Sequence, residues 1–183
     1  MKTWEELEKS CLNCTDCLLS ETRTNVVFGS GDRNAKLMFI GEGPGEQEDL
    51  RGLPFVGRAG QLLDEMLAAI GMSREQVYIA NIVKCRPPNN RDPLNLEQDA
   101  CIGYLREQVR LIKPKIIACL GRVAAMKIIR ADYKITQEHG LFEKRGDILL
   151  TATYHPAYIL RDPRKKPDTF MDMCAIEDQL SLL

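Results

Sequence analysis

The sequence lacks most features of secreted, membrane-bound or strongly charged proteins. Its 183 residues contain no apolar run near the length of a transmembrane helix, and the N-terminal MKTWEELEKS has no apolar stretch typical of a signal peptide. The formal net charge is only -1, so a polyanionic partner would have to be met by a local basic patch. These absences predict a cytoplasmic protein, whose seven cysteines are candidates for metal binding, chemistry or core packing rather than disulfides.

Short apolar runs alternate with helical patterns along the chain. The runs at residues 36–41, 77–83, 115–120 and 148–153 have the length and composition of strands buried in a parallel sheet. Apolar residues recur with helical spacing over residues 62–70 and 101–112, and a closing helix is expected from residue 170 onward. This alternation predicts an α/β fold: a three-layer α/β/α sandwich with a central, mainly parallel four-stranded sheet, in a single domain over residues 1–183.

Three unusual loops follow three of these strands. GEGPG comes after the first, KCRPPNNR comes shortly after Asn81 of the second, and HPAYILR comes after the fourth. Because ligands of such folds gather at the carboxyl ends of the strands, the three loops should converge on one site. The glycine-rich loop lacks the G-x-G-x-x-G and G-x-x-x-x-G-K-[ST] orders, which disfavours a nucleotide-binding loop.

Cysteine spacing indicates a metal site. Cys14 and Cys17 form a C-x2-C pair, and fifteen residues separate Cys85 from Cys101. Four thiolates from two distant segments can close a tetrahedral site. Cys11 and Cys14 form a second C-x2-C pair, and spacing alone separates neither this alternative nor zinc from an iron-sulfur cluster.

The loop motifs together carry a resemblance. GEGPGEQED with GLPFVGRAGQLLD, then NIVKCRPPNNR, then HPAYILR resemble the motifs of the uracil-DNA glycosylase superfamily, most closely its fourth family, the iron-sulfur enzymes of bacteria and archaea. The resemblance covers residues 14–161. It implies a monomeric DNA-repair hydrolase that flips uracil from single- or double-stranded DNA, cleaves the N-glycosidic bond and leaves an abasic site.

Two other classes of protein are alternatives to this interpretation. One is a catalytically silent lesion-binding module of the same fold, and the other is an iron-sulfur electron carrier or nucleotide-binding protein. No motif identifies a protein partner such as a sliding clamp.

The resemblance also implies a cofactor. The fourth family's C-x2-C pattern, followed by TRTNVVFG, implies a structural [4Fe-4S] cluster held by Cys14, Cys17, Cys85 and Cys101. Cys11 is then a spare or an alternate ligand.

Release of uracil builds negative charge on the departing base, chiefly at O2 and N1. His155, fixed by the proline that follows it, is the expected donor to that charge. Asn81 can match both O4 and N3–H of uracil with its amide. The resemblance adds Phe55 as the aromatic floor under the base and Glu48 beside its C5. The simpler alternatives are a strand-capping His155, a turn-forming Asn81 and a core-packing Phe55.

The water-activating group is the next expectation. The best-known family of the superfamily has an aspartate in the first motif, where this chain has Glu42 followed by Gly43, so that carboxylate is missing. Resemblance to the fourth family assigns the water to Asn90, with Asn89 as the alternative and Glu42 as an auxiliary that binds water or stabilises the sugar cation. Gly43 and the glycines at 45, 57 and 60 should bring the main chain close to the flipped nucleotide.

The segment after His155 is the expected DNA contact. Pro156, Ala157 and Tyr158 would supply an apolar tip for the duplex, and Arg161 begins the cationic run RDPRKK, suited to phosphates. The alternative is an ordinary solvated charged surface.

Three other reactive side chains have simpler interpretations. Cys119, within a strand, and Cys174, in the last helix, are predicted to be core residues. His139 is predicted to lie in the loop of a hairpin, with a contact to the DNA backbone as the alternative.

Overall fold

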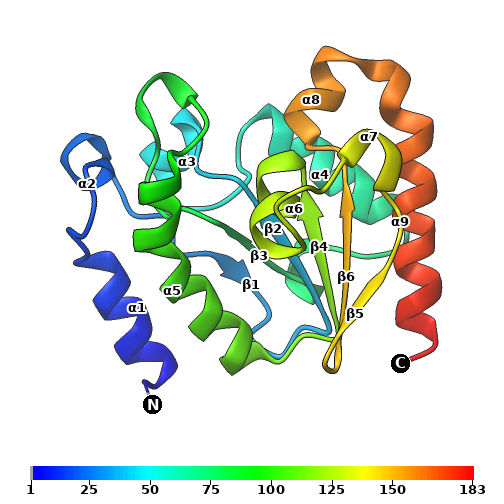
Figure 1. Cartoon of the computed structure of the whole chain (residues 1–183), viewed down its shortest axis with the longest axis horizontal. Coiled ribbons are helices and arrows are strands. Elements are labelled where there is room, and N and C mark those ends of the chain that lie inside the picture. Colours follow the sequence, from blue (N-terminus) through cyan, green and yellow to red (C-terminus); the bar gives the residue numbers. More distant parts are fainter. Residues whose placement is uncertain (1) are drawn as a thin grey trace.

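The computed structural model describes residues 2–183, which are organised around one six-stranded sheet (Figure 1). Its spatial order is β1-β3-β2-β4-β6-β5; the four inner strands run parallel, and each edge strand is antiparallel to its neighbour. The strands are β1 (Ser30–Gly31), β2 (Leu37–Gly41), β3 (Tyr78–Asn81), β4 (Ile116–Leu120), β5 (Glu143–Arg145) and β6 (Ile148–Thr153).

Helices cover both faces of the sheet. One face packs against α1 (Trp4–Leu12), α5 (Asn95–Ile112) and α6 (Arg122–Ile128). The other packs against α4 (Arg58–Ala69), α8 (Pro156–Arg161) and α9 (Lys166–Ser181). The shorter helices are α2 (Leu19–Thr22), α3 (Glu46–Arg51) and α7 (Ile135–Glu138), with 3-10 turns at η1 (Arg74–Gln76), η2 (Pro88–Asn90) and η3 (Pro163–Lys165).

Strand β2 explains why the inner strands are continuous apolar runs. Leu37 and Phe39 pack in the layer of α4 and α9, whereas Met38 and Ile40 pack in the layer of α1 and α5. Successive side chains of a strand point to opposite faces, and here both faces are covered. The predicted three-layer sandwich is therefore confirmed.

The predicted number of strands is wrong. The four expected strands are present as β2, β3, β4 and β6, but the sheet has six strands because β1 and β5 extend its two edges. These edge strands have only 2 and 3 residues, with the polar or small sequences SG and EKR. No apolar run therefore marks them in the sequence. The closing helix is confirmed as α9, although it begins at Lys166.

Two of the three predictions made for His139, Cys119 and Cys174 need correction. His139 caps the C-terminus of α7 and precedes the β5–β6 hairpin, which begins at Glu143, so its predicted place in the hairpin is wrong. Cys119 is fully buried in β4 as predicted, whereas Cys174 on α9 is only partly buried. Within residues 2–183, no helix combines the length and apolar composition needed to cross a membrane.

Candidate active site

A cavity of about 580 Å³ lies where β2, β3, β4 and β6 end. The three motif loops converge there, as the parallel topology requires. Pro156 is the one residue of the expected site around this cavity that does not line it, because it is buried at the first position of α8. The predicted residues that do line it are Glu42, Gly43, Glu48, Phe55, Asn81, Asn90, His155, Ala157, Tyr158 and Arg161.

His155 is held as the N-cap of α8. Its Nδ1 accepts a hydrogen bond of 3.0 Å from the amide of Ala157, which assigns the ring proton to Nε2. Burial lowers the pKa of His155 to about 4; the charge of Arg161 adds to this effect and that of Glu48 opposes it. At neutral pH the ring is therefore an uncharged donor through Nε2–H.

Gly121, directly after β4, makes room for this histidine. Its φ is +92°, and a Cβ atom there would lie 2.8 Å from Cβ of His155. Its amide donates to the carbonyl of Thr153 at 2.9 Å, which joins the ends of β4 and β6. Both the backbone conformation and the close approach require glycine.

A buried carboxylate anchors the end of β6 to α9. Asp172 accepts a hydrogen bond of 2.6 Å from Oγ1 of Thr153, and its Oδ1 lies 2.9 Å from Nδ1 of His139. The ring of His139 is 4.8 Å from that of Tyr154, which lines the cavity next to His155. No sequence motif predicts this cluster, because its members come from three separate segments of the chain.

Asn81 and Phe55 lie together at the cavity. The side chain of Asn81 is buried at the end of β3, and its Oδ1 has no hydrogen-bond partner among the described residues. Phe55 is also buried, with its ring centroid 5.6 Å from that of His155. A Cβ atom at Gly41 would lie 2.5 Å from Oδ1 of Asn81 and 2.7 Å from the Phe55 ring. Glycine at 41 thus allows both side chains to occupy this corner, where an unpaired amide oxygen is costly without a ligand.

Phe55 has an unusual backbone. Its φ is +51°, a conformation that non-glycine residues rarely adopt. Gly60 permits it, because a Cβ atom there would lie 1.8 Å from the carbonyl oxygen of Phe55. Arg74 fixes the turn by donating to that carbonyl and, at 3.0 Å, to the carbonyl of Pro54. The ring is therefore presented by a rigid turn.

Glu48, on α3, ties the glycine-rich segment together. Its Oε1 accepts hydrogen bonds of 2.8 Å from the amides of both Val56 and Gly57. A Cβ atom at Gly45 would lie 2.8 Å from its other oxygen, Oε2. At Gly43, a Cβ atom would lie 2.8 Å from Val83. Gly43 and Gly45 therefore make room for protein atoms, a requirement that no sequence motif indicates.

Glu42 follows β2 and lines the cavity. Burial raises the pKa of its carboxyl to about 7; the charge and hydrogen bond of Asp92 add to the rise, and Arg122 opposes it. Arg122 in turn holds Asp92 through an ion pair of 3.1 Å. A carboxyl that titrates near neutrality is suited to act as a base.

The turn η2 separates the two asparagine candidates. Asn89 and Asn90 both have a φ of +54°. Of the two, Asn90 lines the cavity, and its Oδ1 accepts a hydrogen bond of 2.7 Å from Nε of Arg86. The geometry favours Asn90 for a contact with a ligand.

Helix α8 presents apolar and cationic groups at the rim of the cavity. The side chains of Tyr158 and Leu160 are exposed, and the guanidinium of Arg161 lies 5.9 Å from the Tyr158 ring. Further along the cationic run, Arg164 is paired with Asp162 at 2.7 Å. The positive charge of RDPRKK is therefore partly neutralised within the chain.

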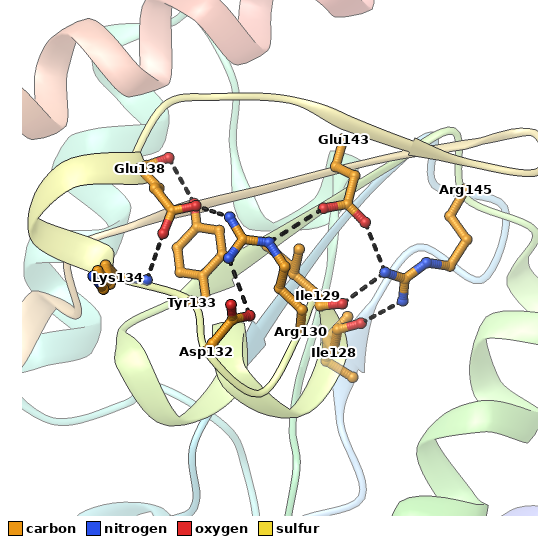
Figure 2. Close-up of polar contacts among 9 residues, drawn as sticks. All are labelled: Ile128, Ile129, Arg130, Asp132, Tyr133, Lys134, Glu138, Glu143 and Arg145. Atoms are coloured by element: carbon orange, nitrogen blue, oxygen red, sulfur yellow. Dashed lines mark hydrogen bonds and ion pairs between the residues drawn. The ribbon is translucent and has the colours of Figure 1, made fainter.

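Helix α7 contributes Ile135 and Thr136 to the wall of the cavity, and an ion pair between Arg130 and Glu138 helps to hold this short helix in place. Figure 2 shows Arg130 between Glu138 at the end of α7 and Glu143 on β5. Arg145 donates to the carbonyls of Ile128 and Ile129 at 2.8 and 2.6 Å, which caps α6 (Figure 2). These contacts join α6, α7 and β5 into one support for the wall.

Five cysteines line a second, small cavity beside the loop that follows β3. They are Cys11, Cys14, Cys17, Cys85 and Cys101, so the structure brings together the four predicted ligands and the alternate. Two of them receive hydrogen bonds: Nη1 of Arg23 donates to Sγ of Cys85 at 3.2 Å, and the amide of Lys84 donates to Sγ of Cys101 at 3.3 Å.

The lining of this cavity, here called the sulfur cage, is rich in possible metal ligands. Nitrogen donors directed at sulfur are the partners expected for metal-bound thiolates. Within residues 2–183, however, no group of three or more His, Cys, Asp or Glu side chains is placed as a bound metal ion would require. The site is thus a cysteine-rich donor set of the kind that binds zinc or an iron-sulfur cluster, and not a preformed coordination sphere.

Comparison with known proteins relates this geometry to one family. The family model described as "Uracil DNA glycosylase superfamily" matches residues 28–177. A Type-4 uracil-DNA glycosylase of Archaeoglobus fulgidus is 43% identical over 176 residues, which cover 92% of this chain and 88% of that protein. A protein of the same name from Thermotoga maritima is 45% identical over 168 residues, covering 88% of each. A Type-5 uracil-DNA glycosylase of Pyrobaculum aerophilum is 31% identical, covering 69% of this chain and 63% of that protein.

Proposed function

The chain belongs to the uracil DNA glycosylase superfamily, and from this premise we propose that it excises uracil from DNA. The enzyme flips a uracil nucleotide out of a single or double strand, hydrolyses the N-glycosidic bond, and releases free uracil from an abasic site. The observation that carries this proposal is the buried, unpaired Oδ1 of Asn81 in the same cavity as an uncharged His155. One group can read the base and the other can stabilise its departure.

Asn81 is the proposed reader of the base. Its Oδ1 accepts N3–H of uracil and its amide nitrogen donates to O4. Cytosine presents the reversed pair and would leave the buried amide without partners, which gives discrimination against it. The Phe55 ring, held on its rigid turn, supplies a stacking surface worth about 1 to 3 kcal/mol per base.

Glu48 is the proposed barrier to thymine. It lies on the cavity wall, and the amides of Val56 and Gly57 hold its carboxylate in place. A side chain anchored by two hydrogen bonds cannot easily move aside for the C5-methyl group. Gly43, beside Glu42, is the proposed point at which the main chain approaches the base.

His155 is the proposed donor to the leaving group. As the glycosidic bond breaks, negative charge grows on uracil O2, and the Nε2–H of a neutral ring can donate to it. The low pKa of His155 supports this role, because a ring that stays neutral donates without giving up its proton.

Asn90 and Glu42 are the proposed partners of the water. The amide of Asn90 orients the water, and the ionised carboxylate of Glu42 accepts its proton or stabilises the positive sugar. The raised pKa of Glu42 supports a base that works near neutral pH.

Helix α8 is the proposed DNA contact. Pro156 and Ala157 fix the entry of the helix, exposed Tyr158 stands at the rim of the cavity, and Arg161 provides a cation for phosphate. The small net charge of the chain agrees with a contact confined to this rim.

We further propose that Cys14, Cys17, Cys85 and Cys101 hold a [4Fe-4S] cluster. When bound, the cluster serves as a structural cross-link between the N-terminal segment and the loop after β3. We also propose that the protein works in the cytoplasm, where a thiolate-bound cluster can be assembled from reduced cysteines.

Release of free base from labelled oligonucleotides tests the function. We expect cleavage of substrates containing uracil, measured beside hypoxanthine and a thymine mismatch, with Asn81→Ala as the inactive control. Binding of uracil DNA without release of uracil would favour the silent lesion-binding module. Reversible electron transfer without DNA binding would favour the electron carrier.

A further inference from the structure

Lys84 is a buried cation with no carboxylate partner in the described part of the chain. Its side chain is 1% exposed, in the segment between β3 and Cys85. None of the ion pairs found within residues 2–183 includes it. Burial of an ammonium group is costly unless it is paired with an anion, and lysine is almost never fully buried without one.

The contacts that the protein does make to this ammonium group are uncharged. Nζ of Lys84 donates to Oε1 of Gln108 at 2.6 Å and lies 5.9 Å from the ring centroid of Phe28. Gln108 is itself fully buried, and its amide nitrogen donates to the carbonyl of Phe28 and the hydroxyl of Tyr78 at 2.9 and 3.1 Å. This network orients the ammonium group without neutralising it.

The sulfur cage is the neighbour of this lysine whose cysteines become anionic thiolates when they bind a metal. Lys84 lines the cage together with Cys11 and Cys101, and its backbone amide donates to Sγ of Cys101 at 3.3 Å. A second cation, Arg23, donates to Sγ of Cys85 at 3.2 Å and is only partly buried. Two cations therefore lie against the cage.

We propose that Lys84 and Arg23 are the counter-charges of the cluster, an inference that rests on the proposed [4Fe-4S] cofactor. Four thiolates around an oxidised cluster core leave about two negative charges in excess, and these two side chains supply two positive charges. The cluster then supplies a counter-charge to a lysine whose other contacts are all uncharged. The pair stabilises the bound cluster, and removing either charge disfavours the further negative charge that reduction adds.

Neutral variants at both positions test the proposal. Lys84→Met removes the charge and the hydrogen bond to Gln108, whereas Lys84→Gln removes the charge and retains an N–H donor. Arg23→Gln, at a partly exposed position, serves as the variant with little risk to folding. Lys144→Met, at an exposed position on β5, is the matched control.

Three measurements on the purified holoprotein are informative: iron and sulfide per chain, the rate of iron release to a chelator, and the midpoint of a reductive titration. We expect both Lys84 variants to release iron about tenfold faster than the parental protein, since a buried charge pair is broken. Their midpoints should be more negative, those of Arg23→Gln should shift in the same direction, and Lys144→Met should match the parent. After the cluster is removed, Lys84→Gln should withstand more denaturant than the parental apoprotein, which keeps an unneutralised lysine.

The outcomes separate this inference from the cofactor on which it rests. Parental protein with zinc or without iron overturns the [4Fe-4S] proposal and the counter-charges with it. A normal cluster in the parent with unchanged midpoints in Lys84→Gln and Arg23→Gln overturns the counter-charges alone. An effect seen in Lys84→Met but absent in Lys84→Gln also overturns them, because the hydrogen bond to Gln108 would then be the cause. If the Lys84 variants do not fold, the midpoint of Arg23→Gln decides the matter.

Discussion

The rate of uracil excision should fall as the pH is lowered through about 7, because Glu42 becomes protonated there. Burial and the neighbouring Asp92 raise the pKa of its carboxyl to about 7, against 4.5 for an ordinary glutamate. If the ionised form assists the water or the sugar cation, the rate of the chemical step should follow the fraction of Glu42 that is ionised. His155 should not contribute to this acidic limb of the pH profile, because its pKa is lowered to about 4.

The size of the effect follows from the pKa. Roughly one tenth of Glu42 is ionised at pH 6 and roughly nine tenths at pH 8, so the single-turnover rate should rise about tenfold over that range. With a pKa of 4.5, the rate would be nearly constant there. The raised pKa also affects folding: its contribution to stability is full below pH 4.5 and is lost as the pH rises through 7. Glu42→Gln should therefore be more stable than the parent above pH 7.

The assay is single-turnover excision with enzyme in excess over a uracil oligonucleotide, between pH 5 and pH 9. Glu42→Gln should be slower, with a rate that no longer rises between pH 6 and pH 8. Asp92→Asn should move the limb to lower pH, and Arg122→Gln should move it to higher pH, because these residues act on Glu42 with opposite sign. A parental limb near pH 4.5, or a limb near pH 7 that persists in Glu42→Gln, would refute the reasoning.

Three further predictions concern groups around the base. His155→Ala should slow excision by about 10²- to 10³-fold with DNA binding retained. A 5-fluorouracil substrate, which has a better leaving group, should restore the rate of His155→Ala more than that of Asn90→Ala; equal restoration in the two variants contradicts the donor role. Asn81→Ala should lose activity on uracil, and Asn81→Asp should shift preference toward cytosine, because a protonated carboxyl presents its donor and acceptor differently; parental rates on uracil in both variants exclude Asn81 as the reader. Gly121→Ala should lower both the thermal midpoint and the excision rate, since its Cβ atom would lie 2.8 Å from that of His155 at a φ of +92°; Gly103→Ala, with no atom within 4 Å, is the control that should change neither much.

The inner strands could be predicted from the sequence, because a strand that is buried on both faces has apolar residues at nearly every position. KLMFIG is apolar throughout, since alternate residues of β2 pack into opposite layers. The edge strands β1 and β5 carry no such pattern, because each has one neighbour and only a few residues. Their pairing depends on the position of β3 and β6, which a local pattern does not contain.

The ordered motifs predicted many of the residues that line the cavity. The electrostatic environment of those residues, however, comes from groups far apart in the chain. Glu42 lies fifty positions before Asp92, yet Asp92 contributes to its raised pKa. The same holds for Asp172, which anchors Thr153 and His139 from the last helix. A motif fixes which side chains end the strands, whereas a pKa depends on every charge that folding brings near. The raised pKa of Glu42 therefore required the structure, whereas its place at the end of β2 and its auxiliary role did not.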